Sequence, residues 1–83
     1  MYNYFMLIGI VEGYYYGQTF TIKLKVDRMF GQGTDHFEIK IIDEPMIKFA
    51  KEVVEMGKKI TIKGRLVQSE SKLELLGERI ITM

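Results

Sequence analysis

The chain has no cysteine and only one histidine and one proline among its 83 residues. Without cysteine it can form no disulfide, offers no thiolate nucleophile and cannot hold zinc through sulfur, which fits a reducing compartment. A single histidine and scattered carboxylates show no spacing typical of a catalytic or metal site. We therefore expect no enzymatic activity, no metal ion and no other cofactor.

A charge imbalance and long apolar runs are also lacking. Twelve Lys and Arg residues nearly balance 11 Asp and Glu residues, so any preference for a polyanion must come from where the basic residues lie. The longest apolar run, Tyr4 to Val11, is too short to span a bilayer and shows no basic leader or cleavage site. With 47% apolar and 28% charged residues, residues 1–83 are expected to form one small cytoplasmic domain without a membrane segment.

One stretch is expected to be helical. Asp43 can accept a hydrogen bond from the first turn, and Pro45 is tolerated near a helix start. Gly57 can take the left-handed conformation that ends a helix. The sequence therefore predicts a helix from Asp43 to Gly57, and the spacing of its apolar residues predicts a buried face of Met46, Phe49, Ala50, Val53 and Val54.

The other segments are typical of strands, because apolar and polar residues alternate along them. The run Tyr4 to Val11 is a strand that is apolar on both faces, and residues 12–17, with three tyrosines between glycines, are predicted to be a loop. Further strands are predicted at residues 19–28, 36–42, 59–66 and 73–83, with a polar turn from Gln68 to Ser71. A change of parity near Leu76 and Gly77 predicts a bulge in the last strand.

The order of these elements indicates the fold. Three strands, a helix and two strands are the arrangement of the OB-fold, an all-β class with a five-stranded Greek-key barrel and one α-helix between strands three and four. An SH3-like barrel is the runner-up, but it rarely has so long a helix at that position. We therefore predict a single OB-fold domain over residues 1–83.

Five short segments, in the same order along the chain, match a known family: Asn3–Gly9, Phe20–Arg28, Thr34–Phe37, Gly57–Leu66 and Glu78–Ile80. Through them the chain resembles the bacterial single-stranded DNA-binding proteins and the related primosomal protein B. The resemblance implies that Phe30 lies where the family carries an aromatic for base stacking, in the loop between strands two and three. It also implies that His36 takes the place of a second aromatic on strand three.

The chain departs from this family in two places. The turn between strands four and five is short and has no aromatic residue. The acidic tail with which the family recruits other proteins has no counterpart before Met83, so recruitment of partners through such a tail is not expected. Both departures suggest a small accessory version of the family.

The candidate nucleic-acid site centres on lysines of the predicted hairpin of strands two and three. Lys23, Lys25 and Lys40 share its outer face, which OB-folds use for oligonucleotides, and aromatic residues in nearby loops can flank it. A basic groove with aromatics suits single-strand binding with little sequence preference. The predicted site comprises Tyr14, Tyr15, Tyr16, Lys23, Lys25, Arg28, Phe30, His36 and Lys40, and the predicted function is single-stranded DNA binding, accessory to DNA replication, repair or recombination.

Other interpretations stay open. The same face would serve RNA equally well, and the lysines can instead simply keep a strand face soluble. In a protein-interaction module, the first strand and the tyrosines would form an interface between proteins. A first strand that is apolar on both faces favours a homo-oligomer, a dimer before a tetramer. Glu38, between His36 and Lys40 on the same face, argues for weak or selective affinity.

Overall fold

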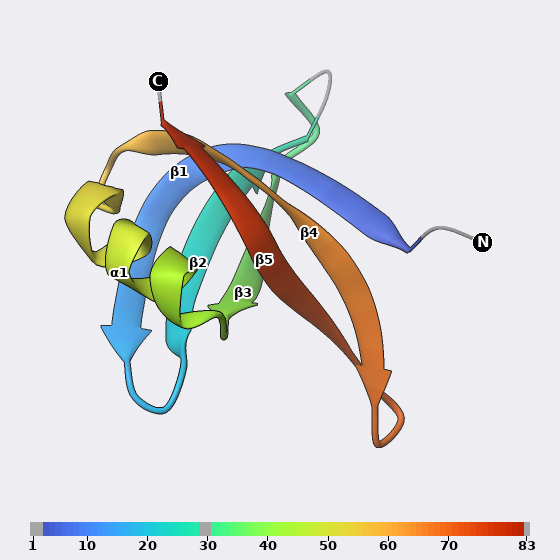
Figure 1. Cartoon of the computed structure of the whole chain (residues 1–83). Coiled ribbons are helices and arrows are strands. Elements are labelled where there is room, and N and C mark those ends of the chain that lie inside the picture. Colours follow the sequence, from blue (N-terminus) through green and yellow to red (C-terminus); the bar gives the residue numbers. More distant parts are fainter. Residues whose placement is uncertain (1–2, 29–30, 83) are drawn as a thin grey trace.

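The computed structural model describes residues 3–28 and 31–82. Its elements follow in the order β1 (Tyr4–Tyr16), β2 (Phe20–Asp27), β3 (Thr34–Ile41), α1 (Glu44–Val53), β4 (Lys59–Ser69) and β5 (Lys72–Thr82). The strands close into a barrel in the order β1-β2-β3-β5-β4 (Figure 1). The predicted OB-fold, with one helix between β3 and β4, is confirmed.

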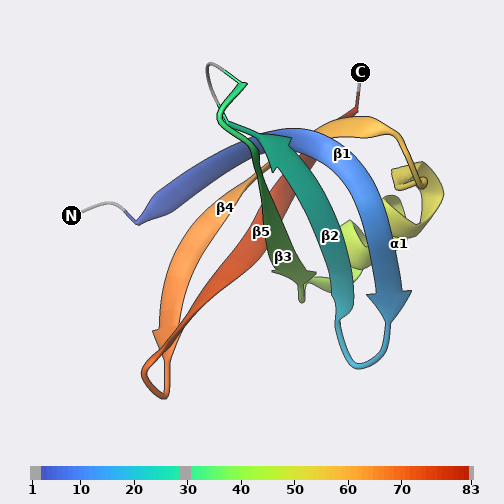
Figure 2. The same ribbon diagram turned by 180° about the vertical axis from the view of Figure 1, so that it is seen from behind.

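Strand β1 is long and curved, and it joins the two sides of the barrel. Its first half pairs with β4 and its second half with β2, both antiparallel. Strands β3 and β5 are parallel and pair only at Ile39 with Leu75 and Lys40 with Leu76. The β4–β5 hairpin continues past this short contact, and its tip projects from the barrel (Figure 2).

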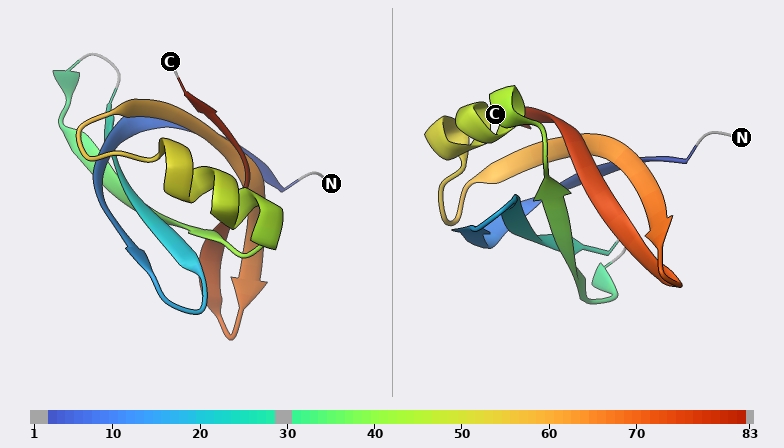
Figure 3. Two further views of the ribbon diagram at one scale, coloured as in Figure 1. Left: turned by 60° about the vertical axis from the view of Figure 1, so that its left-hand side comes forward. Right: turned by 60° about the horizontal axis from the view of Figure 1, so that its bottom comes forward.

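The core follows from the alternation along the strands. Phe20, Ile22 and Leu24 of β2 are buried inside the barrel, as their parity predicts. Helix α1 covers one end of the barrel (Figure 3) and adds its own apolar residues to the same core. The other buried apolar side chains are Val11, Ile39, Ile41, Ile47, Ala50, Val54, Ile60, Ile62 and Ile80.

Helix α1 begins where the sequence predicts and ends earlier. The Asp43 carboxylate accepts a hydrogen bond from the backbone N–H of Met46 at 3.3 Å, which is the predicted cap. Val54, directly after the helix, already has extended backbone. The predicted end at Gly57 is wrong, because the Gly57 N–H donates to the carbonyl of Val11 and this tertiary bond draws the segment toward β1.

The buried face of α1 also differs in part from the prediction. Ala50 and Val54 are buried as expected, and Ile47 is buried although the prediction omits it. Phe49, predicted to be buried, is 40% exposed. The helix has only ten residues. The spacing of its apolar residues therefore does not determine which of two neighbouring apolar side chains faces the barrel.

Strand β1 includes the three tyrosines that the sequence assigns to a loop. Pairing with β2 is interrupted between Val11 and Gly13, which makes Glu12 a bulge, and then continues to the end of β1. The prediction of a loop over residues 12–17 is therefore wrong. Gly13 marks an irregularity inside a strand, as glycine often does, and the chain reverses at residues 17–19.

The β4–β5 hairpin closes through a tighter turn than predicted. Only Glu70 and Ser71 separate the strands, and both have positive φ, 49° and 63°. Two residues with positive φ suit the twist of a two-residue hairpin. The predicted bulge in β5 is confirmed one residue later, because Gly77 and Arg79 pair with consecutive residues of β4 and leave Glu78 as the extra residue.

Candidate nucleic-acid interface

The antiparallel register of β2 and β3 places the predicted basic residues side by side. Lys23 lies opposite Glu38, and Lys25 lies opposite His36. Because the neighbouring positions along β2 and β3 fill the core, these side chains point outward. We call this surface the lysine face; it comprises Lys23, Lys25, His36, Glu38 and Lys40.

Carboxylates lie beside most of the basic side chains on the lysine face. Lys23 Nζ lies 3.8 Å from a carboxylate oxygen of Glu38 on the neighbouring strand. His36 Nδ1 lies 2.6 Å from Oε2 of Glu12, so the β1 bulge aims its side chain at β3. The face therefore mixes basic and acidic groups instead of forming a continuous basic stripe.

Arg28 lies at the end of β2, near the lysine face, and is bound by Asp35. Its Nη2 lies 2.6 Å from Asp35 Oδ1, and its Nε lies 3.0 and 3.1 Å from the two carboxylate oxygens. The hydrogen bond from Arg28 lowers the pKa of Asp35, and the same bond raises the pKa of Arg28. Both groups are therefore charged at neutral pH. A phosphate can contact Arg28 either while Asp35 stays bound to it or by displacing Asp35.

A groove of about 390 Å³ lies between β3 and the β4–β5 hairpin, next to the lysine face. Its apolar part is formed by Phe37, Leu66, Leu73 and Leu75. Leu73 is 64% exposed, because the hairpin extends past the barrel. The ionisable side chains that line this β3–β5 groove are His36, Glu38, Lys40, Lys72 and Glu74.

The apolar part of the groove is not among the predicted site residues. Alternation along residues 36–42 predicts that Phe37 faces the core, whereas Phe37 is only half-buried and lines the groove. The sequence gives one indication for Leu73, because its position in the alternating pattern disagrees with that of Leu76 and Ile80. That disagreement predicts a bulge, but only the projection of the hairpin shows that Leu73 is left uncovered.

Two of the three predicted tyrosines lie away from the lysine face. Tyr14 stacks on Phe20 with ring centroids 5.8 Å apart, and Tyr16 meets the same ring edge-on at 6.3 Å. The Nζ of Lys51 in α1 lies 3.6 Å from the centroid of the Tyr16 ring. These contacts hold Tyr14 and Tyr16 against the core residue Phe20 and the helix side of the barrel.

Tyr15 points to the other side and shares the lysine face. It pairs with Thr21, which in turn pairs with Lys40, so Tyr15 extends the same row of outward side chains. Its side chain is 53% exposed, which leaves a ring surface open for a base. Phe30, the stacking residue implied by the resemblance, lies outside the described residues.

Neither a metal cluster nor a membrane helix is found in the described part of the chain. Within residues 3–28 and 31–82, no three His, Asp or Glu side chains gather in a way that could hold a metal ion. Across the same ranges, α1 is too short and too polar to cross a bilayer.

The barrel and the face described above define an OB-fold protein with a mixed basic, acidic and aromatic surface. By sequence, the chain matches no protein-family model and no curated protein. By structure, it is similar to the mitochondrial single-stranded DNA-binding protein Rim1 of S. cerevisiae, with a TM-score of 0.85 and 15% identity over 100% of this chain and 94% of that one.

Two further solved structures have the same fold. The single-stranded DNA-binding protein of Plasmodium falciparum, in complex with single-stranded DNA, aligns with a TM-score of 0.74 and 18% identity over 100% of this chain and 96% of that one. The dimeric N-terminal domain of PriB from Thermoanaerobacter tencongensis aligns with a TM-score of 0.70 and 22% identity over 98% and 96% of the two chains. The resemblance predicted from sequence, to the single-stranded DNA-binding proteins and primosomal protein B, is confirmed in the fold.

Proposed function

We propose that the protein binds single-stranded DNA along the lysine face and into the β3–β5 groove, with little sequence preference and without catalysis. The observation that carries this proposal is the placement of lysines directly beside an apolar groove on this face of an OB-fold. The Plasmodium falciparum relative in fold is described in complex with the same ligand. Such an activity would serve DNA replication, repair or recombination in the cytoplasm.

The chemistry of the groove favours an unpaired strand. Apolar side chains such as Phe37 and Leu73 can contact base faces, which a duplex keeps stacked inside. Lys23, Lys25 and Lys40 lie where they can contact phosphates of the same strand. Because every base has an apolar face, contacts of this kind discriminate weakly between sequences.

Titration with oligonucleotides tests this proposal. We expect an oligothymidylate of about ten nucleotides, within the roughly 4–16 that an OB-fold covers, to bind more tightly than a duplex of equal length. At most four cations, the three lysines of the lysine face and Arg28, can contact phosphates. The slope of log affinity against log salt should therefore lie between about −0.7 and −3. Equal affinity for the duplex, or a slope of zero, would exclude the proposal, and tighter binding of an RNA strand would redirect it to RNA.

The contribution of Lys25 can be measured separately. Lys25 is the one lysine of the lysine face without a carboxylate within 4.0 Å among the described residues. We expect Lys25→Ala to make the salt slope shallower by about 0.7 and to weaken binding equally for all sequences. Lys48→Ala, on the exposed side of α1, removes the same charge elsewhere and should leave the slope unchanged. Equal slopes for the two variants would remove Lys25 from the site.

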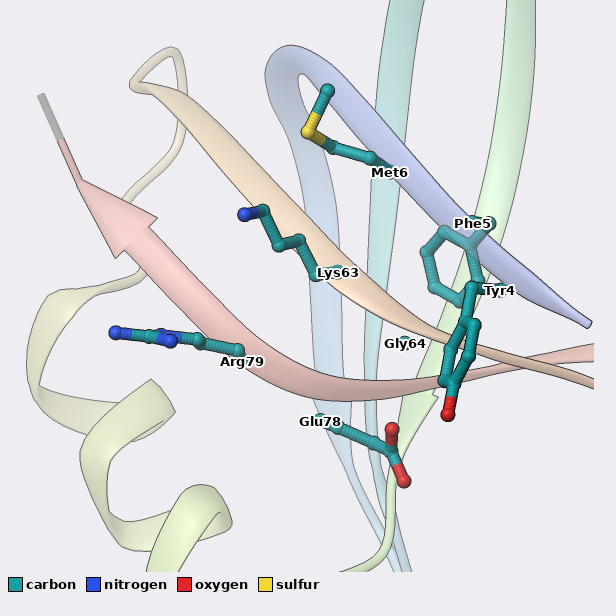
Figure 4. Close-up of a pocket in the computed structure, with 7 residues that line it drawn as sticks. All are labelled: Tyr4, Phe5, Met6, Lys63, Gly64, Glu78 and Arg79. Atoms are coloured by element: carbon teal, nitrogen blue, oxygen red, sulfur yellow. The ribbon is translucent and has the colours of Figure 1, made fainter. Parts of the chain in front are cut away.

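We also propose that the protein forms a dimer through β1. Tyr4, Met6 and Ile8 form a stripe on its outer side and are 63%, 57% and 47% exposed. Figure 4 shows Tyr4 and Met6, together with Lys63 and Arg79, among the residues that line a hollow of about 600 Å³. An apolar stripe of this kind, rimmed by polar groups, is typical of a surface that another protein covers.

The backbone of β1 supports the same proposal. Pairing with β2 begins at Ile10, so Phe5 to Ile8 pair only with β4 among the described strands. An exposed strand edge next to apolar side chains is a site where a second copy can add its own strand. The PriB domain of the same fold is described as dimeric.

A further inference from the structure

Most of the basic side chains at the interface are already paired with the protein's own carboxylates. Among the described residues, Lys23 is paired with Glu38, Arg28 with Asp35, and His36 with Glu12, and Lys40 is paired with Glu74. Except at Lys25, a phosphate that approaches this surface therefore meets a basic side chain that already has a carboxylate partner. To contact such a side chain, the phosphate must displace the carboxylate or share the basic group with it.

The pair of Lys40 and Glu74 is the most shielded of them. Lys40 Nζ donates to Glu74 Oε1 at 3.0 Å, and the Glu74 side chain is only 26% exposed, the lowest exposure of any group in these pairs. Lower exposure means weaker screening by water and salt. The pair joins β3 to β5 at the β3–β5 groove, where both residues line the wall.

We infer that Glu74 is an affinity-determining residue that competes with nucleic-acid phosphate for Lys40. This inference rests on the proposed function. A strand that enters the groove must replace the Glu74 carboxylate by a phosphate, which leaves a negative group next to the bound strand. Glu74 therefore weakens binding, and a strand with several phosphates overcomes this competition better than a single phosphate group does.

The same exchange changes the salt dependence. A phosphate that contacts a free lysine releases a condensed counterion from the strand, which gives about 0.7 of slope per contact. When the phosphate displaces Glu74, the freed carboxylate attracts a cation of its own, so fewer ions are released in total. Glu74 should therefore make the slope shallower as well as lower the affinity.

Replacing Glu74 by glutamine tests the inference, because glutamine keeps the size and removes the charge. At low salt, Glu74→Gln should tighten binding of an oligothymidylate by about two- to fivefold, the range expected for a partly exposed ion pair. The slope should become steeper by up to about 0.7. Glu70→Gln is the matched control: it removes the same charge at the tip of the same hairpin, where Glu70 has no ion pair among the described residues.

A double-mutant cycle with Lys40→Gln separates competition from a structural role. If Glu74 acts by competing for Lys40, the gain from Glu74→Gln should vanish in the Lys40→Gln background. A gain of equal size in both backgrounds would overturn the inference, as would weaker binding by folded Glu74→Gln. If the wild-type protein binds no oligonucleotide, the proposed function itself fails; if it binds and Glu74→Gln matches Glu70→Gln, only the role of Glu74 fails.

Discussion

Replacing Gly64 by alanine should strongly destabilise the protein. A Cβ atom at this position would lie 1.8 Å from the carbonyl oxygen of Leu76 and 2.9 Å from the ring of Phe5. The oxygen belongs to the backbone of β5 beside the bulge, so no side-chain rotation can relieve the clash. We expect a loss of about 3 kcal/mol or more, a large part of the roughly 5–15 kcal/mol that stabilises a small domain.

Gly17→Ala is the control for this substitution. No atom lies within 4 Å of a Cβ built at Gly17, so alanine there should be neutral or slightly stabilising. Urea denaturation of the two variants measures the difference in the free energy of unfolding. If the variants unfold at the same urea concentration, β4 and β5 do not approach each other at Gly64 as described.

Replacing Met6 by glutamate should convert the proposed dimer into a monomer. Met6 lies at the centre of the exposed stripe on β1, and an unpaired charge buried in an interface costs about 3–5 kcal/mol. The dissociation constant should therefore rise by roughly 150- to 4000-fold. Met6 is 57% exposed in the single chain, so the new carboxylate stays in water in the monomer and the fold itself should persist.

The matched control is Leu73→Glu, which places the same charge at another exposed apolar residue, on the hairpin away from β1. Sedimentation equilibrium at micromolar concentration should give a dimer for the wild type and Leu73→Glu and a monomer for Met6→Glu. A monomeric wild type would refute the dimer. A dimeric Met6→Glu that retains its fold would place the interface elsewhere.

The parts of the fold that the sequence predicts correctly depend on local patterns. Alternation along β2, β3 and β4 identifies their buried sides, because a strand has a period of two. The Asp43 cap is equally local, since its bond spans three residues. Two of the wrong predictions, the end of the helix at Gly57 and the loop around the three tyrosines, fall where the chain follows hydrogen bonds to another segment.

The candidate site divides in the same way. The sequence by itself determined that Lys23, Lys25 and Lys40 share one face, because strand parity and the order of the elements fix which side chains point outward. Only the tertiary structure decided that Glu12 and Glu74 reach this face and that Phe37 and Leu73 border a groove. These contacts join residues 24 or more positions apart. Their geometry depends on a bulge in β1 and on how far the β4–β5 hairpin extends past the barrel, and a local pattern of residues can encode neither of these.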